Sequence, residues 1–361
     1  MARGIAHDLE WRRPPALEYL AALLHGRRAR LAEAERLDPL CLLRTLPELA
    51  RAACPGADYR AAAELQRRVV HDLVVELSFA AGCLVEAGRE LLAAMQARYQ
   101  VENLKVVLRA FLNHLPLERV ERNLLFVPEA LGLDLPELLE AGTLEKLASL
   151  VPLDAPRSAL QSALRRSSAP PRLFFLEAAL DRGYLEDLLE KAGQLGADDR
   201  AVVRPIVEQE ACAFQLMLVV RGRFLHGLAP ETLLPLHLRS SGLSRARFRA
   251  MSAAPDVRAS AIPALGRAID ILPAGSEPGE TSPAAGIARL ESMAWTRHLR
   301  LSIRAFRRSH MGLGAIVGYF GIRRVEVQNL ITLSEGVRGG VAMESIRARL
   351  IPRAVLEVAR V

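Results

Sequence analysis

The sequence predicts an all-α protein made of three pseudo-repeated helical units. Apolar residues recur at steps of three and four along most of the 361-residue chain, and the period-two alternation of strands is scarce. The composition agrees, because 51% of the residues are hydrophobic but only 5% are aromatic. One helical pattern also returns every 113 residues, and this recurrence predicts the three units.

The predicted helices follow one another with short interruptions. Long helices are predicted where the apolar period persists, over 61–97, 174–194, 203–226 and 287–309. Shorter helices are predicted to begin near Asp134, Thr143 and Pro230, where a capping residue or a proline precedes an apolar pattern. Proline and glycine mark the interruptions, of which the longest is predicted to be a flexible loop: 114–116, 152–156, 169–171, 227–230 and the loop 272–286.

The helix predicted around RYQVENLKVVLRAF, residues 98–111, carries an apolar and a polar stripe. The apolar stripe must be buried, and it consists of Val101, Leu104, Leu108, Phe111 and Leu115. The polar stripe consists of Glu102, Lys105, Arg109 and Asn113. Taken alone, such a polar stripe is typical of a solvated helix face that is weakly stabilised by pairs at i,i+3 and i,i+4.

This helix recurs, and so do its neighbours on both sides. The copies read VENLKVVL at 101–108, AFQLMLVV at 213–220 and VQNLITLS at 327–334. Each is followed by a turn and a second amphipathic segment with a glutamate in the same place: Glu118, Glu231 and Glu344. Asn103 and Asn329 are separated by twice the period, and Gln215 takes their place in the middle copy after a slip of one residue.

The repeat predicts how the chain divides. We expect an N-terminal arm over 1–18 and helical units over 19–140, 141–253 and 254–361. Three similar units in one chain indicate a pseudo-threefold axis. Chance similarity between leucine-rich helices is the alternative explanation.

Charge and cysteine content restrict the class of protein only weakly. A net charge of +7 permits an acidic protein, anionic lipid or nucleic acid as partner, but the basic residues are nearly all arginine, a bias that base composition can produce. The cysteines lack the spacing of a zinc or redox motif, so we expect free thiols in a reducing compartment: Cys41, Cys54, Cys83 and Cys212. The longest apolar run, ACAFQLMLVV, is about half the ~20 residues that a membrane span needs.

No motif in the sequence predicts catalysis. A Gly-rich phosphate loop, a His-Glu-x-x-His pair and a nucleophile elbow are all missing, and the histidines are scattered without ligand spacing. Asp181 and Glu186 lie near Tyr184 on one predicted helix, but helix surfaces commonly carry such carboxylates. We therefore expect no catalytic residue, no metal and no cofactor.

Several motifs, and their order along the chain, resemble those of the C subunits of V-type and A-type ATPases. The eukaryotic members of this family are called d subunits. The resemblance runs from about Tyr19 to Leu350 and includes an Asp-x-x-Tyr helix, a Glu-Asn-Leu-Lys-x-x-Leu-Arg helix, and a final Glu-x-x-Asn-Leu helix followed by Glu-Ser-Ile-Arg. These motifs are Asp181 and Tyr184; Glu102, Asn103, Leu104, Lys105, Leu108 and Arg109; and Glu326, Asn329, Leu330, Glu344, Ile346 and Arg347.

The resemblance implies a non-catalytic rotor subunit of a rotary ATPase. Such a subunit is a funnel of three helical units, seated as a monomer within the complex on the cytoplasmic face of the membrane. It binds the central-shaft subunits and the membrane proteolipid ring, it is peripheral rather than spanning, and it binds no nucleic acid. The middle copy, AFQLMLVV, departs from the polar Asn-bearing pattern of the family.

Two groups of residues are candidates for binding these partners. The first group lies on the polar stripe and its copy near the C-terminus: Glu102, Asn103, Lys105, Arg109, Glu326 and Asn329. The second group forms a basic face on one predicted helix: Arg297, Arg300, Arg304 and Arg308. The basic face could contact an acidic shaft subunit or lipid headgroups, and an exposed face without a partner is the simpler interpretation.

A helical-repeat adaptor that binds an acidic protein or nucleic acid is the alternative function. The scarcity of aromatic residues and of any recognised reader motif counts against nucleic acid. A solenoid would also show more repeats of shorter period, typically about 30–47 residues.

Overall fold

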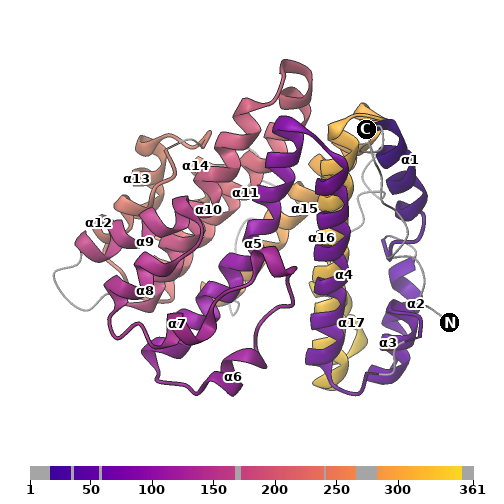
Figure 1. Cartoon of the computed structure of the whole chain (residues 1–361), viewed down its shortest axis with the longest axis horizontal. Helices are drawn as coiled ribbons and strands as arrows, with labels where there is room; N and C mark the ends of the chain where they lie inside the picture. Colours follow the sequence, from indigo (N-terminus) through magenta and orange to yellow (C-terminus); the bar gives the residue numbers. More distant parts are fainter. Residues whose placement is uncertain are drawn as a thin grey trace.

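The computed structural model describes residues 17–33, 36–56, 59–166, 172–239, 241–265 and 283–351. The described residues contain helices and loops but no strand, which confirms the predicted all-α class (Figure 1). The helices are α1 Leu17–Arg28, α2 Leu37–Cys41, α3 Leu46–Ala53, α4 Ala62–Cys83, α5 Glu86–Leu112, α6 Leu117–Glu121, η2 Glu129–Leu131, α7 Leu135–Leu139, α8 Leu144–Leu150, α9 Asp154–Arg166, α10 Leu173–Gln194, α11 Ala197–Phe224, α12 Pro230–Leu233, η3 Leu234–Leu236, α13 Arg245–Ala253, α14 Val257–Leu265, α15 Pro283–Ser309, α16 Leu313–Arg338 and α17 Met343–Arg349.

Six long helices form three consecutive pairs: α4 with α5, α10 with α11, and α15 with α16. Only two or three residues connect the two helices of each pair. The periodic segment 61–97 is therefore two helices rather than one, because Leu84 and Val85 adopt extended backbone and Glu86 has a φ of 50°. The apolar period continues across this break because both helices bury a face in the same core.

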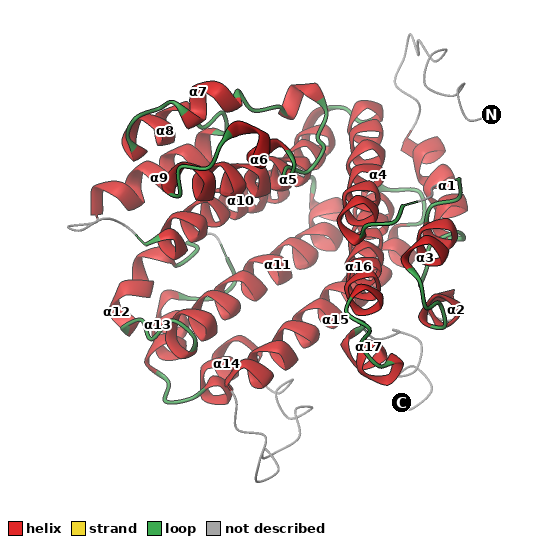
Figure 2. Ribbon diagram, turned by 90° about the horizontal axis from the view of Figure 1, so that it is seen from below, coloured by secondary structure: helices red, strands yellow, loops and turns green. Residues whose placement is uncertain are grey.

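The contacts between these six helices close a circuit. Going round it, α4 packs on α5, α5 on α10, α10 on α11, α11 on α15, α15 on α16, and α16 again on α4 (Figure 2). Helices α1 and α3 pack on α16, while α9 covers α10 and α12–α14 gather beside α11 at the other end of the molecule. The first and last long pairs of the chain are thus neighbours.

Some sequence predictions fall on residues outside the described ranges. The N-terminal arm 1–18 is described only at its last two residues, which belong to α1. The predicted loop 272–286 is described only from residue 283, where α15 begins. The four cysteines all lie in described parts of the chain and form no disulfide there, and Cys41 and Cys83 are buried.

The second helix of each pair ends in the same way. Two or three residues past each helix end, one residue has a left-handed backbone: His114 with a φ of 51°, Gly227 with 61° and Gly340 with 60°. These positions are 113 residues apart. The short helices that follow, α6, α12 and α17, share a buried apolar residue at the same place, namely Val120, Leu233 and Ile346. The sequence repeat is therefore also a repeat of backbone geometry.

This comparison predicts a stabilising substitution at His114. A side chain in the left-handed region costs about 1 kcal/mol, and glycine avoids that cost, as it does in the other two units. We expect His114→Gly to raise the free energy of unfolding by about 0.5–1 kcal/mol, measured by chemical denaturation. Gly227→Ala and Gly340→Ala are the matched controls and should lower it by a similar amount. A destabilising His114→Gly would show that the His114 side chain contributes more than its strained backbone costs.

Candidate partner-binding site

One amide side chain in each unit holds the chain segment that follows the short helix. Asn103 is buried, accepts a hydrogen bond from the Leu125 N–H (2.7 Å) and donates one to the Leu125 carbonyl (2.9 Å). Asn329 accepts from the Ile351 N–H (2.9 Å) in the same way. Both asparagines are satisfied inside the chain, which explains why this polar residue recurs in an apolar stretch.

The middle unit uses Gln215 for the same purpose. Its side-chain oxygen accepts from the Leu238 N–H (3.1 Å), and its nitrogen donates to Ser241 Oγ (2.9 Å). Leu238 lies 113 residues after Leu125 and 113 before Ile351, so the three amides bind equivalent backbone positions. We call Asn103, Gln215 and Asn329 the amide clamps.

The other members of the first polar stripe lie at the seam between α5 and α10. Lys105 is only 8% exposed, and its Nζ lies 2.6 Å from Asp181 Oδ1 and 3.1 Å from Glu102 Oε1. Arg109 Nε donates to Glu177 Oε1 at 2.5 Å. Burial raises the pKa of Asp181, and the Lys105 ammonium offsets this effect only in part. The stripe is thus paired with the next unit rather than simply solvated.

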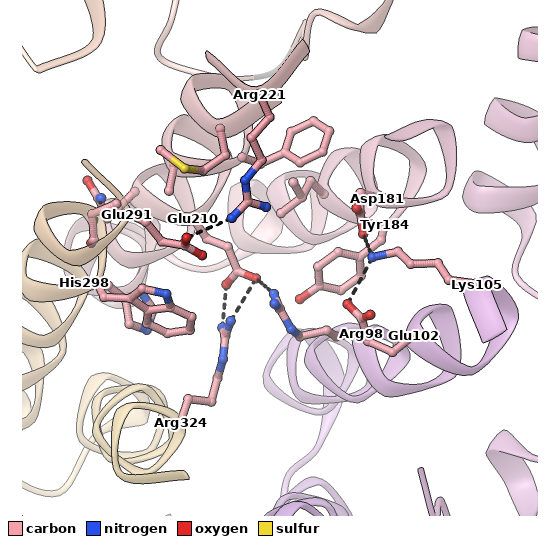
Figure 3. Close-up of a pocket in the computed structure, with 17 residues that line it drawn as sticks. Arg98, Glu102, Lys105, Asp181, Tyr184, Glu210, Arg221, Glu291, His298 and Arg324 are labelled. Atoms are coloured by element: carbon pink, nitrogen blue, oxygen red, sulfur yellow. Dashed lines mark hydrogen bonds and ion pairs between the residues drawn. The ribbon is translucent and has the colours of Figure 1, made fainter. Parts of the chain in front are cut away.

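The second helices of the three units meet at an ion triad (Figure 3). Glu210 on α11 accepts hydrogen bonds from Arg98 on α5 and from both Nη atoms of Arg324 on α16, the shorter at 2.6 Å. We call Arg98, Glu210 and Arg324 the central triad. Burial alone would raise the pKa of Glu210, but the two guanidinium groups outweigh it and hold the pKa at about 2. Glu210 is therefore ionised at every physiological pH.

A cavity of about 280 Å³ opens beside the central triad, with a lining from α5, α10, α11, α15 and α16. Its lining includes the pair Arg221–Glu291, with 2.8 Å between Nη2 and Oε2 (Figure 3). Trp295 and Phe214 also line it. The charges of the lining cancel, because the cations Arg98, Lys105, Arg221 and Arg324 face the anions Glu102, Asp181, Glu210 and Glu291.

His298 completes the cavity wall as a neutral side chain. It is 5% exposed, and its Nε2 has no hydrogen-bond partner within the part of the chain that the structure describes. Burial and the nearby Arg324 charge lower the pKa of His298 to about 3. The imidazole thus adds no positive charge beside the two guanidinium groups.

The remaining candidates divide into buried and exposed residues. Glu326 is buried, accepts from the Ala32 N–H (2.5 Å) and pairs with Arg323. The basic face is exposed along α15, where its members are Arg297, Arg300, Arg304 and Arg308. On the opposite side of α15, Leu299 and Phe306 are buried. Whether any candidate contacts a partner stays a prediction.

Sequence reasoning did not identify the central triad or His298. A signal for the triad was present in the repeat, because Arg98 and Arg324 are separated by twice 113 residues. Glu210 lies 112 residues after Arg98, which is the same one-residue slip that separates Gln215 from its counterparts. The equivalent position of the three repeats thus carries Arg, Glu and Arg, and this change of charge sign could have indicated that the three side chains meet.

Two other kinds of site are not found in the described residues. Within these ranges, no group of three or more His, Cys, Asp or Glu side chains could hold a metal ion. No helix in the same part of the chain has the length and apolar character that crossing a membrane requires.

Comparison with known protein families gave a match over nearly the whole chain. A family model described as ATP synthase (C/AC39) subunit matches residues 20–349. No curated protein matches the chain.

Proposed function

Because the chain belongs to the ATP synthase (C/AC39) subunit family, a family of V/A-type ATPase subunits, we propose that it is a rotor subunit of a rotary ATPase. In this role it couples the central shaft to the membrane proteolipid ring, so that ATP hydrolysis drives ion transport or ion flow drives ATP synthesis. The observation that carries the proposal is the extent of the family match, which includes all three long helix pairs.

The proposal includes a mechanical rather than a chemical role. The three helix pairs form a funnel around a pseudo-threefold axis, and the shaft enters the hollow of that funnel. Two observations support this arrangement. The contacts of the six long helices close a circuit, and equivalent residues of α5, α11 and α16 meet at the central triad.

In this proposal the protein is a monomer on the cytoplasmic face of the membrane, peripheral to it. Purification of the tagged full-length chain from solubilised membranes tests this placement. We expect shaft and proteolipid-ring subunits to copurify in fixed ratio, as identified by mass spectrometry. A chain that purifies with nucleic acid, or with regulatory proteins but no ATPase subunits, would instead support the adaptor function.

The basic face of α15 is the proposed contact with an acidic surface of the complex. Arg304 and Arg308 are exposed on this face. Reversing two charges at the edge of an interface typically costs about 1–2 kcal/mol, so we expect Arg304→Glu/Arg308→Glu to weaken incorporation about 5- to 30-fold. The measurement is the amount of chain that a purified ATPase complex retains as ionic strength increases.

The matched control for this prediction is Arg165→Glu/Arg166→Glu, which reverses two exposed charges at the end of α9. We expect the control to assemble normally. Equal incorporation of both variants would exclude the basic face as a contact.

A further inference from the structure

The central triad joins all three units at one point inside the circuit of helices. Other interactions between units join two of them: Lys105–Asp181 joins α5 to α10, Arg221–Glu291 joins α11 to α15, and the Tyr319 hydroxyl donates to Glu76 of α4 from α16 (2.8 Å). Glu210 accepts from two units at once while it belongs to the third. One carboxylate thus holds α5, α11 and α16 together.

The three residues of the triad occupy one position of the repeat. Glu210 is 112 residues from Arg98 and 114 from Arg324, and each lies on the second helix of its unit. If the three units carried the same charged residue here, three like charges would meet with little solvent between them. The side chains of Glu210, Arg324 and Arg98 are 11%, 13% and 30% exposed, so solvent would screen such repulsion only in part. The glutamate of the middle unit removes this conflict.

The surroundings balance the charge that remains on the triad. Two guanidinium groups and one carboxylate leave one positive charge, and the nearby Glu102 carboxylate favours the charged form of Arg98. The Arg324 guanidinium carbon also lies 5.6 Å from the centre of the Trp295 ring. The carboxylate need not lie on α11, because the three residues occupy one position of the repeat and converge on one point.

We propose that the central triad is an electrostatic latch that closes the circuit of helix pairs, and that it requires one carboxylate and two guanidinium groups without requiring the carboxylate on α11. The latch keeps the second helices together and sets the width of the cavity beside them. This inference concerns the folded chain itself and does not rest on the proposed function.

A charge permutation tests the latch. Glu210→Arg brings three guanidinium groups together, and we expect its melting temperature to fall by roughly 4–7 °C, as for the loss of one partner from a buried ion pair in a chain of this size. Hydrogen exchange should accelerate at least about tenfold in α5, α11 and α16. The double variant Glu210→Arg/Arg324→Glu restores one carboxylate and two guanidinium groups, and we expect it to recover at least half of the loss.

The double variant separates a latch from an ordinary buried glutamate. If Glu210 were needed only at its own position, the second substitution would lower the melting temperature further instead of raising it again. A double variant no more stable than Glu210→Arg, including the case in which both are insoluble, overturns the proposal. The matched control is the exchange of an exposed pair, Glu90→Lys/Lys191→Glu, which should shift the melting temperature by less than about 2 °C.

Discussion

Replacing Gly318 with alanine is expected to destabilise the chain by about 3 kcal/mol. Gly318 lies on α16 where it crosses α15, and an added Cβ would come within 2.5 Å of the Ser302 carbonyl oxygen and 2.7 Å of the Phe306 nitrogen. Both are backbone atoms of α15, so neither can rotate away. The two helices would have to separate, and the cost of such overpacking is typically about 1–3 kcal/mol or more. Chemical denaturation of the purified chain measures the effect.

A glycine-to-alanine substitution at Gly193 should instead increase the free energy of unfolding. Gly193 lies near the end of α10, and a Cβ there would meet nothing within 4 Å. Alanine is the better helix former, so Gly193→Ala is expected to stabilise the chain by about 0.5–1 kcal/mol. If both variants were destabilised equally, the loss at Gly318 would not be due to the close approach of α15.

The second large effect is expected at the first amide clamp. Asn103→Leu keeps the side-chain volume roughly unchanged but removes both hydrogen bonds to Leu125, whose N–H and carbonyl then lose their partner. An unsatisfied buried polar group costs about 1–3 kcal/mol, and because Leu125 is half-buried we expect a loss of about 2 kcal/mol in the free energy of unfolding. Hydrogen exchange of the Leu125 amide should accelerate more than that of amides in α4.

A nearby asparagine provides the control for this prediction. Asn113 lies at the end of the same helix, is exposed, and donates only to the Arg109 carbonyl (2.7 Å) among the described residues. Asn113→Leu is expected to change stability by no more than about 0.5 kcal/mol. A small effect at Asn103 as well would show that the segment after α6 is held by its apolar contacts and not by the clamp.

The features that sequence predicted correctly are local. Thr143 and Asp134 cap their helices as expected, since their side chains accept from the N–H of Lys146 (3.2 Å) and Glu137 (3.0 Å). Pro230 opens α12 as predicted. The equivalence of Gln215 with the two asparagines was also visible, because a repeat compares positions along one chain and needs no knowledge of distant contacts.

The features that sequence did not predict depend on partners far along the chain. Periodicity identifies the polar face of a helix. It does not reveal that Lys105, on such a face, is buried against Asp181 on a helix of another unit. Nor does it show that Glu326 binds the backbone at Ala32, 294 residues away. The break at Leu84 was not predicted for a different reason: both helices beside it bury a face in the same core, so the apolar period continues across it.

The seam between α4 and α16 has a consequence for the order in which the chain folds. The amide clamps close loops of only 22–23 residues, whereas Gln66 Nε2 reaches Ser334 Oγ across 268 residues. Closing a long loop costs more entropy and takes more time than closing a short one. During synthesis, each helix pair can therefore assemble as it leaves the ribosome, while the face of α4 that packs on α16 waits for the last part of the polypeptide. We expect this face to be where the nascent chain depends most on chaperones.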